Sequence, residues 1–461
     1  MIERLRGGTC SPVHRAISRR LTPPRIFILS FALLVLAGAL MLWMPFAVSG
    51  RGLSFVDALF SSASAVCVTG LTVIDIGRDL SLTGQIVTLV LFQVGGLGII
   101  TFSVVVFGLM GRGISFKGRE IVQSTFLHTP QRDFIVIIKR VLLLTALSEG
   151  LGTLLLFVRF AQDFPLATAL FRALYTAVSA FNNCGYSLFD SLTSYRGDWL
   201  VNVTVMGLIV LGGIGFIVQH EVIAQIRGSR KELSLHTKLV LLTSSTLIVA
   251  GAVLFYLFEA GNTLQGIPGS TQVLDSLFQS ITARTAGFNT VEIGKLTNPT
   301  ILVMIILMFI GASPGSTGGG IKTTSFTLLL LLIWNRMKGR FEVNVFNRTI
   351  PREILGRTIA IIFASGFSVC LIASLLLFFG GEGGGPDQSR HFFVEYLFET
   401  VSAFGTVGLS MGVTAKLNDI QKLAVVLMMF AGRVGPLALA FSWYAAGKKE
   451  IKYAEESVMV G

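Results

Sequence analysis

The sequence predicts an all-α polytopic membrane protein with four membrane–pore–membrane repeats in a pseudo-fourfold arrangement around one pore. Composition gives the class: 52% of the 461 residues are hydrophobic, 13% are charged, and the mean hydropathy is +0.74. Soluble domains carry about 25% charged residues. Several apolar runs also exceed the ~18–20 residues that a helix needs to cross a bilayer. Between pairs of these runs lies a short apolar segment that ends at a glycine, and this unit occurs four times, which predicts the repeats.

Each repeat should contain a full span, a half-crossing helix, a glycine turn and a second full span. The eight full transmembrane helices are expected at residues 26–48, 85–110, 141–160, 199–225, 239–258, 299–334, 358–380 and 417–444. The half-crossing helices are expected at 55–65, 169–180, 273–283 and 393–403. The resulting divisions are an N-terminal segment (1–25), four repeats (26–110, 134–226, 236–335 and 352–446) and a C-terminal tail (447–461). The first run is too long for the core of a cleaved signal peptide, so we expect a retained span.

The distribution of charge predicts the topology. Basic residues gather in segments between alternate pairs of spans, at 1–25, 111–140, 227–238, 335–357 and 447–452. The segments on the other side carry fewer Lys and Arg, and their acidic residues include Asp163, Asp190, Asp198, Glu259, Asp275, Glu382, Asp387 and Glu395. Basic loops stay on the cytoplasmic side of membrane proteins, so both termini should be cytoplasmic. This placement accounts for the formal net charge of +12 without nucleic acid as a partner.

The sequence contains no constellation of catalytic or metal-binding residues, so we expect a protein that is not an enzyme. The cysteines are Cys10, Cys67, Cys184 and Cys370. Their spacing fits neither a metal site nor a disulfide framework. His220-Glu221 has no third ligand at metal spacing, and we interpret it as a polar helix end. No Ser/His/Asp set or nucleotide fingerprint occurs, so this chain should bind no nucleotide itself.

Four glycine turns follow the half-crossing helices, and the clearest is Thr406-Val407-Gly408. Glycine lets the backbone turn its carbonyl oxygens toward an axis where a side chain would clash. A ring of such carbonyls can replace the hydration shell of K⁺. The four glycines recur at intervals of 115, 102 and 121 residues, and the expected filter residues are Val68, Thr69, Gly70, Asn183, Cys184, Gly185, Thr285, Ala286, Gly287, Thr406, Val407 and Gly408. The sequence therefore predicts a potassium filter made from all four turns.

The four turns also align outside the glycine. An aromatic residue stands four positions before a Ser/Thr-Ala pair in each repeat, and the pairs are Ser64-Ala65, Ser179-Ala180, Thr282-Ala283 and Ser402-Ala403. From the Ser or Thr to the glycine is six residues in three repeats but five in the third, so the third turn should sit differently. Polar loops or interfacial helices are the alternative for a single segment. Four segments in register argue against it, because irregular backbone at membrane depth must be buried or line water.

A small-residue motif follows in each second span, at 95–98, 212–215, 311–315 and 432–435. In the first two repeats, close helix packing and the need to leave room for a pore both remain open as explanations. In the fourth repeat, Arg433 takes the place where two other repeats have glycine. A charge at bilayer depth costs ~2.5–3.5 kcal/mol and should face water or a partner. We interpret Arg433 as a fixed positive charge in the ion path that contacts carbonyls of the 311–320 loop; the alternative is a structural clamp.

The second span of the third repeat should be broken within the membrane. Residues 311–322 contain five glycines and a proline, which do not suit a helix interior. One helix over 299–334 would be roughly 54 Å long, against a hydrocarbon core of ~30 Å. We expect a gating loop made by Gly311, Ser313, Pro314, Gly315, Ser316, Thr317, Gly318, Gly319, Gly320 and Lys322. A phosphate-binding loop is disfavoured, because Ile321 separates the glycines from Lys322 and no strand precedes them.

Two further charged residues fall within the membrane region. Arg284 directly precedes the third turn and should brace it from behind rather than meet ions. Glu149 lies in the span expected at 141–160, and the sequence identifies no partner for it.

Together, the filter glycines, the 311–322 motif and Gly-Arg-x-Gly at 432–435 resemble the Trk/Ktr/HKT superfamily of cation transporters over residues 26–446. With eight full spans the chain looks like the bacterial Ktr translocating subunits (KtrB type), since Trk-type subunits carry an extra N-terminal pair. Glycine at all four filter positions implies potassium selectivity, whereas a serine in the first filter goes with sodium-permeable plant relatives. The resemblance also implies a homodimer with one pore per protomer in the lipid of the bacterial inner membrane. It further implies a cytoplasmic ring of KtrA-type nucleotide-binding subunits, Na⁺ as an activator, and a gate made by the broken helix with Arg433.

Two transport mechanisms follow from these residues. The first is gated, channel-like K⁺ uptake through the four turns. The second is a secondary K⁺/Na⁺ or K⁺/H⁺ symporter with a binding site at broken helices near the midplane. Such transporters usually show inverted repeats, whereas the four units here enter the membrane from the same side, which favours the first mechanism.

Overall fold

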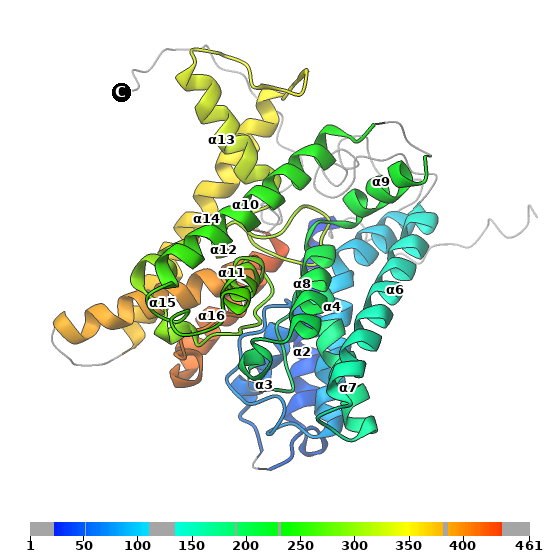
Figure 1. Cartoon of the computed structure of the whole chain (residues 1–461), viewed down its shortest axis with the longest axis vertical. Helices are drawn as coiled ribbons and strands as arrows, with labels where there is room; N and C mark the ends of the chain where they lie inside the picture. The colour runs from blue at the N-terminus through cyan, green and yellow to red at the C-terminus, as the bar shows by residue number, and fades with distance from the viewer. Residues whose placement is uncertain are drawn as a thin grey trace, which may run out of the picture.

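The computed structural model describes residues 23–50, 52–109, 134–189, 191–228, 232–380 and 386–435. Several predictions fall outside these ranges: the N-terminal segment up to residue 22, the basic loop at 111–133, Asp190, Glu382, the end of the fourth repeat after residue 435, and the C-terminal tail. Within the described ranges the chain is almost entirely helical (Figure 1), as the composition predicts.

The helices follow the predicted order of span, half-crossing helix and second span. The first group is α2 (Pro23–Trp43), α3 (Phe55–Val66) and α4 (Leu82–Leu109), and the second is α6 (Phe134–Phe160), α7 (Leu166–Phe181), α8 (Trp199–Gly213) and α9 (Phe216–Ile226). The third is α10 (Leu235–Glu259), α11 (Gly269–Thr282), α12 (Asn298–Phe309) and α13 (Thr323–Met337), and the fourth is α14 (Arg352–Phe379), α15 (Pro386–Gly405) and α16 (Asp419–Val434). The half-crossing helices are therefore α3, α7, α11 and α15.

The spans differ in length. Among the described residues, three helices are long and apolar enough to cross a membrane: Lys139–Phe160, Leu235–Glu259 and Arg352–Phe379. A fourth crossing results if α8 and α9, which are bent by 103° relative to each other, are counted as one span. The other apolar helices are shorter over the part that can be assessed, including α12 and the described parts of α2 and α4. Eight full spans therefore remain a prediction.

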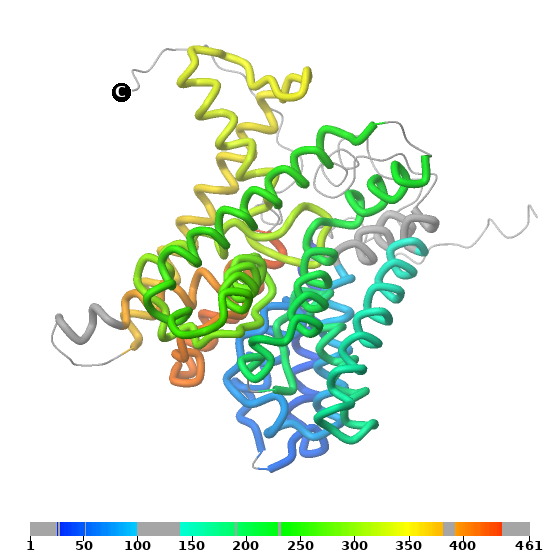
Figure 2. Tube along the Cα trace, viewed as in Figure 1, coloured from blue at the N-terminus to red at the C-terminus, as the bar shows by residue number. Residues whose placement is uncertain are grey.

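The four groups pack in a closed cyclic order. The second span of each group contacts the half-crossing helix of the next: α4 with α7, α8 with α11, α12 with α15, and α16 with α3. The last contact brings the end of the described chain back against its beginning (Figure 2). Small residues make this close packing feasible, since the last turns of α3 consist of buried serine, alanine and valine. The half-crossing helices therefore surround a common centre.

The second span of the second group is interrupted, and the prediction of one continuous helix over 199–225 is wrong. α8 ends at Gly213, and α9 begins at Phe216 after a break at Gly215, whose φ is +92°. The backbone N–H of Phe216 donates to the carbonyl oxygen of Gly315 at 3.0 Å, outside its own helix. The helix can stop here for two reasons. Gly215 adopts a left-handed conformation without steric cost, and the N–H of Phe216 has a hydrogen-bond acceptor outside the helix.

The second span of the third group is broken, as predicted. α12 ends at Phe309 and α13 begins at Thr323, with a non-helical loop between them. α13 and the beginning of α14 rise beyond the bundle (Figure 1). They are joined by a two-stranded hairpin, β1 (Asn344–Val345) and β2 (Arg348–Thr349), in a segment predicted to be cytoplasmic.

Candidate functional site

The four predicted turns share one backbone conformation. In each turn, the glycine and the residue two positions before it have positive φ, and the residue between them does not. The glycines are Gly70, Gly185, Gly287 and Gly408, with φ of 89°, 80°, 79° and 92°; the earlier residues are Val68, Asn183, Thr285 and Thr406, with φ of 56°, 57°, 75° and 50°. Positive φ is a genuine outlier for β-branched residues. The same strained conformation at four matching positions means that the surrounding structure holds each turn in place.

The turns meet in a closed ring. Each glycine lies so close to the carbonyl oxygen of the middle residue of the next turn that an added Cβ would collide with it. The pairs, in order round the ring, are Gly70 with Cys184, Gly185 with Ala286, Gly287 with Val407, and Gly408 with Thr69. No side chain fits at these four positions. The ring is therefore built from backbone, and it closes in the same order as the helix packing.

Serines of the half-crossing helices hold the first, second and fourth turns in the same way. The middle N–H of each turn donates to a serine carbonyl five residues earlier at 2.8 Å, in the pairs Thr69–Ser64, Cys184–Ser179 and Val407–Ser402. In the first and fourth turns the serine hydroxyl also accepts from the glycine N–H, at 3.0 Å for Ser64 and 3.1 Å for Ser402. In the sequence alone, these serines stand out only as markers of the repeat. Their recurrence six residues before a glycine was the signal that assigns them to the site.

The third turn is held differently, which confirms the expectation drawn from its shorter spacing. The N–H of Ala286 donates to the carbonyl of Thr282, four residues earlier, at 3.0 Å. The Thr282 hydroxyl donates to the carbonyl of Phe288 at 2.6 Å instead of accepting from the glycine. From Thr282 to Gly287 is one residue fewer than in the other repeats, and the hydrogen-bonded turn is correspondingly one residue shorter. Gly287 nevertheless keeps its place in the ring.

Replacing Ser402 with alanine should weaken the fourth turn. The substitution removes the hydroxyl that accepts from the N–H of Gly408, and one such bond contributes about 1 kcal/mol, or roughly fivefold in an equilibrium. For the potassium filter that the sequence predicts, we expect a change of about that size in the apparent KM for K⁺, measured from initial uptake rates. Ser374→Ala is the matched control, because its exposed hydroxyl bonds only within its own helix, to the carbonyl of Cys370. Equal KM values for the two variants would contradict the assignment of Ser402 to the site.

The loop between α12 and α13 lies against three of the four turns. Its consecutive residues meet the first position of consecutive turns: Thr317 with Asn183, Gly318 with Thr285, and Gly319 with Thr406. The Thr317 hydroxyl lies 3.3 Å from the Asn183 side-chain amide, and the N–H of Gly319 donates to the Thr406 hydroxyl at 3.0 Å. A Cβ on Gly318 would collide with the Thr285 hydroxyl. The loop therefore covers one side of the ring at contact distance.

The loop is also bound to the break in the second group. The N–H groups of Ser313 and Thr317 donate to the carbonyls of Gly213 and Gly212, at 3.0 and 3.2 Å. Lys322 donates from Nζ to the carbonyl of Gly318 at 2.8 Å, so its ammonium is held by the loop itself. Of the other predicted gate residues, Gly311, Ser316 and Gly319 are buried, whereas Pro314, Gly315 and Gly320 are partly exposed. The two interrupted spans thus share one hydrogen-bonded junction.

Arg433 completes this layer on the remaining side. It lies in the last turn of α16, is 4% exposed, and donates to the carbonyl of Thr317 in the loop, as predicted. It also donates to the carbonyls of Gly95 and Gly96 on α4, at 2.6 and 3.2 Å, which sequence reasoning did not foresee. Its Nε has no hydrogen-bond partner among the described residues. Arg433 therefore links the loop of the third group to α4 of the first group.

Close packing accounts for the small residues of the second spans. A Cβ on Gly95, Gly212 or Gly432 would collide with the carbonyl oxygen at or near the end of a half-crossing helix. The carbonyl in question belongs to Val66, Phe181 and Phe404 respectively. For the glycines of the first two repeats, the sequence left two explanations open, close helix packing and room for a pore. These contacts favour packing. These glycines let the second spans touch the backbone that leads directly into the turns.

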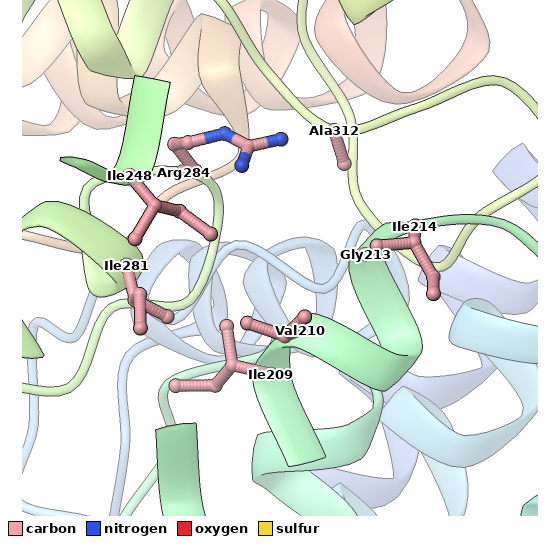
Figure 3. Close-up of a pocket in the computed structure, with 8 residues that line it drawn as sticks. All are labelled: Ile209, Val210, Gly213, Ile214, Ile248, Ile281, Arg284 and Ala312. Atoms are coloured by element: carbon pink, nitrogen blue, oxygen red, sulfur yellow. The ribbon is translucent and has the colours of Figure 1, made fainter. Parts of the chain in front are cut away.

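Arg284 lies behind the third turn, as predicted. It is 8% exposed and donates to the carbonyl and hydroxyl of Ser244 on α10, at 3.3 and 3.2 Å. Its side chain borders a cavity of about 20 Å³, lined mostly by aliphatic side chains, and extends toward Ala312 of the loop (Figure 3). That volume is enough for one water molecule. Arg284 contributes no group to the ring itself.

The remaining polar candidates do not form a chemical site. His220 and Glu221 lie in the middle of α9 and not at a helix end, so that prediction is wrong. His220 lies beside Arg140 of α6, and Glu221 accepts from the N–H of Ser234 and the hydroxyl of Thr237 at the start of α10, so both side chains have structural partners. In the part of the chain that the structure describes, no three His, Cys, Asp or Glu residues stand close enough to hold a metal ion. The three described cysteines, Cys67, Cys184 and Cys370, are free.

Comparison with known proteins identifies the family. The sequence model described as TrkH, cation transport protein, matches residues 23–446. The chain belongs to the TrkH cation transport family. Among similar proteins, it is 37% identical over 442 residues to the Ktr system potassium uptake protein B of Vibrio alginolyticus, with 95% of each chain covered. It is 32% identical over 456 residues to the potassium/sodium uptake protein NtpJ of Enterococcus hirae, covering 97% of this chain and 99% of that protein.

A solved structure supports the TrkH-family fold. The structure is similar to the crystal structure of the potassium transporter TrkH from Vibrio parahaemolyticus, with a TM-score of 0.69, 20% sequence identity, and coverage of 91% of this chain and 84% of that one. Membership of the TrkH family makes this chain a multi-pass membrane transporter rather than an enzyme. The predicted resemblance is thereby confirmed at the level of the family.

Proposed function

We propose that this TrkH-family protein takes up K⁺ across the bacterial cytoplasmic membrane through the ring of four turns. The closed order of the turns carries the proposal, because the carbonyl of the middle residue of each turn lies against the glycine of a neighbouring turn, all the way round the ring. Carbonyl rings of this kind replace the hydration shell of K⁺. The names of the two relatives, a potassium uptake protein and a potassium/sodium uptake protein, support the same cation. The filter then consists of the three residues of each turn.

The loop at 310–322 and Arg433 form the gate in this proposal. The loop contacts three turns, and Arg433 joins it to α4 on the fourth side, so an ion leaving the ring meets this layer next. A guanidinium held by neutral carbonyls keeps its positive charge uncompensated in a low-dielectric setting, where it opposes cation passage. Opening requires the loop to leave the turns and Arg433 to lose its bond to Thr317.

The assembly follows from the Ktr resemblance. We propose a homodimer with one pore in each protomer, controlled by a cytoplasmic ring of nucleotide-binding subunits and stimulated by Na⁺. The relative's designation as part of a Ktr system and the potassium/sodium name of the second relative are consistent with these features.

Growth complementation tests the function. The full chain is expressed in a bacterial strain that lacks K⁺ uptake, with and without a nucleotide-binding subunit, and growth is measured at low external K⁺. We expect rescue, and faster K⁺ uptake when the subunit is present. Failure under both conditions, with the protein inserted in the membrane, would reject K⁺ as the substrate.

Gly70→Ser should lower discrimination between K⁺ and Na⁺. Gly70 has a φ of +89°, and any Cβ there meets the carbonyl oxygen of Cys184. A side chain must displace that carbonyl, and a shift that costs about 1.4 kcal/mol changes relative ion affinity about tenfold. The K⁺/Na⁺ uptake ratio should therefore fall by roughly this factor, measured by ion competition at matched protein content. A ratio equal to that of the parent would remove Gly70 from the filter.

A secondary symporter is the second candidate. The junction between the interrupted spans favours it, because broken helices form the ion sites of many such transporters. The two mechanisms differ in the final K⁺ gradient. A channel-like path lets K⁺ reach only the distribution set by the membrane potential, whereas a symporter exceeds it when a Na⁺ or H⁺ gradient is imposed on proteoliposomes.

A further inference from the structure

A buried carboxylate lies behind the second turn, at the meeting point of three helices. Glu149 of α6 is 9% exposed and accepts two hydrogen bonds from side-chain amides. One donor is Nδ2 of Asn182, at 3.1 Å from Oε1, and the other is Nε2 of Gln93 on α4, at 3.3 Å from Oε2. Asn182 also donates to Oε1 of Gln93, so the three side chains bond to one another. This cluster supplies the partners that the sequence did not identify for Glu149.

The position of Glu149 is costly for a carboxylate. Its neighbours Leu147 and Leu151 are 62% and 60% exposed on the opposite, lipid-facing side of α6, so Glu149 points into the protein at the depth of a spanning helix. Its hydrogen-bond partners are neutral amides, and among the described residues it forms no ion pair. Ionisable side chains within membrane segments are rare and usually have a functional role.

Asn182 connects this cluster directly to the ring. It is the last residue before the strained Asn183, and its side chain fills the space beside Gly96, where an added Cβ would collide with Oδ1. The carbonyl of Gly96 is one of those that hold Arg433. Asn182 is therefore fixed on one side by Glu149 and Gln93, and on the other by the segment of α4 that binds the guanidinium.

The third turn has a matching arrangement. Arg284 stands at the position that corresponds to Asn182, one residue before the first left-handed residue, and it is likewise bonded to the first span of its own group, through Ser244. The first and fourth turns have Cys67 and Gly405 at this position; glycine has no side chain, and in the part of the chain that the structure describes the Cys67 thiol makes no hydrogen bond to its first span. Polar anchoring from the first span is thus a property of two adjacent turns.

We propose that Glu149 is a positioning residue for the second turn, which acts through Asn182 and sets the affinity and selectivity of the ring for K⁺. The proposal rests on the proposed K⁺ uptake function. Without the carboxylate, Asn182 loses its acceptor on α6, and the backbone of Asn183 and Cys184 loses the restraint immediately before it. The carbonyl of Cys184, which lies against Gly70, then has more freedom to accommodate an ion of another size.

The test measures initial K⁺ uptake rates in vesicles of phosphatidylethanolamine and phosphatidylglycerol that contain the full chain, with Na⁺ as competitor. We expect Glu149→Leu to raise the KM for K⁺ about tenfold and to lower the K⁺/Na⁺ ratio by a similar factor, since a buried polar group is left without its partner. Asn182→Ala should give the same changes. Because the two side chains act through one bond, the double variant should match the single ones rather than multiply them. Glu149→Gln, which keeps the shape and one acceptor, should recover most of the parent KM.

Glu259→Gln is the matched control, since it alters another buried carboxylate, one that bonds to Thr297 and Thr300 and contacts no turn. It should keep the parent KM and ratio, even if less protein folds. Parent values for both Glu149→Leu and Asn182→Ala would overturn the proposal, as would effects that multiply in the double variant. If Glu149→Leu does not insert, Asn182→Ala and Glu149→Gln decide the question. A parent chain that takes up no K⁺ would instead reject the proposed function.

Discussion

Gly408→Val should abolish K⁺ uptake while leaving the protein in the membrane. Gly408 has a φ of +92°, a conformation in which a β-branched residue is an outlier. Its Cβ would collide with the carbonyl oxygen of Thr69 and press on Gly70 of the first turn. Strain of ~1–3 kcal/mol from the backbone alone, with the collision added, should reduce uptake at least about 100-fold. The measurement is the initial K⁺ uptake rate per inserted protein.

Gly412→Val is a suitable control, because Gly412 also has a positive φ but an added Cβ there would meet no other atom. Gly412 lies four residues further along, has a φ of +94°, and has open space where a Cβ would be. Gly412→Val should therefore cost backbone strain but keep most of the uptake. If Gly408→Val and Gly412→Val lose uptake equally, general strain rather than the ring explains the result.

Arg433→Ala should raise K⁺ flux through the closed protein by about tenfold. The substitution removes the bonds to the loop carbonyl of Thr317 and to the carbonyls of Gly95 and Gly96. It also removes a positive charge from the proposed ion path, and ~1.4 kcal/mol less opposition corresponds to that factor. The measurement is K⁺ efflux from loaded proteoliposomes without any activating subunit.

Arg433→Lys separates the gate from the structural clamp. Lysine keeps the charge but offers a single ammonium instead of a planar fork, so it cannot bond to the loop and to α4 in the same geometry. A fixed charge in the ion path predicts low flux for the lysine variant and high flux for the alanine variant. A clamp predicts that both variants lose folded protein and that flux per folded molecule does not change.

The local pattern of the sequence predicted the elements that depend on short-range chemistry. A helix is present at each of the four places predicted for a half-crossing helix, and each ends within two residues of the predicted end, where the turn begins. The predicted starts are less accurate: α15 begins at Pro386 instead of residue 393, because an apolar run next to a turn indicates where a helix ends but not how far it extends on its polar side. The four turn glycines have the positive φ that their missing side chain permits, whereas the positive φ of the residues two positions earlier was not predicted. The break between α12 and α13 could be predicted because Pro314 and the neighbouring glycines disfavour a helix by themselves.

The break between α8 and α9 could not be predicted from the local pattern of residues. The same Gly-x-Gly pattern occurs at Gly96 and Gly98, where α4 continues as a helix, and at Gly213 and Gly215, where the helix stops. What differs is the neighbour: the carbonyl of Gly315 accepts from Phe216 only because the broken third span lies beside α8. A pattern of glycines permits a break, but the hydrogen-bond partner decides it.

By itself, the sequence determined the membrane class, the fourfold recurrence, the twelve turn residues and the interrupted third span, since each follows from composition or from contacts within a few residues. Only the tertiary structure decided the order in which the turns close, the pairing of residues 317–319 with three turns, the bonds from Arg433 to α4, and the partners of Glu149. These contacts join backbone and side-chain groups from different helices. Their geometry depends on how the helices pack, which no local pattern of residues specifies.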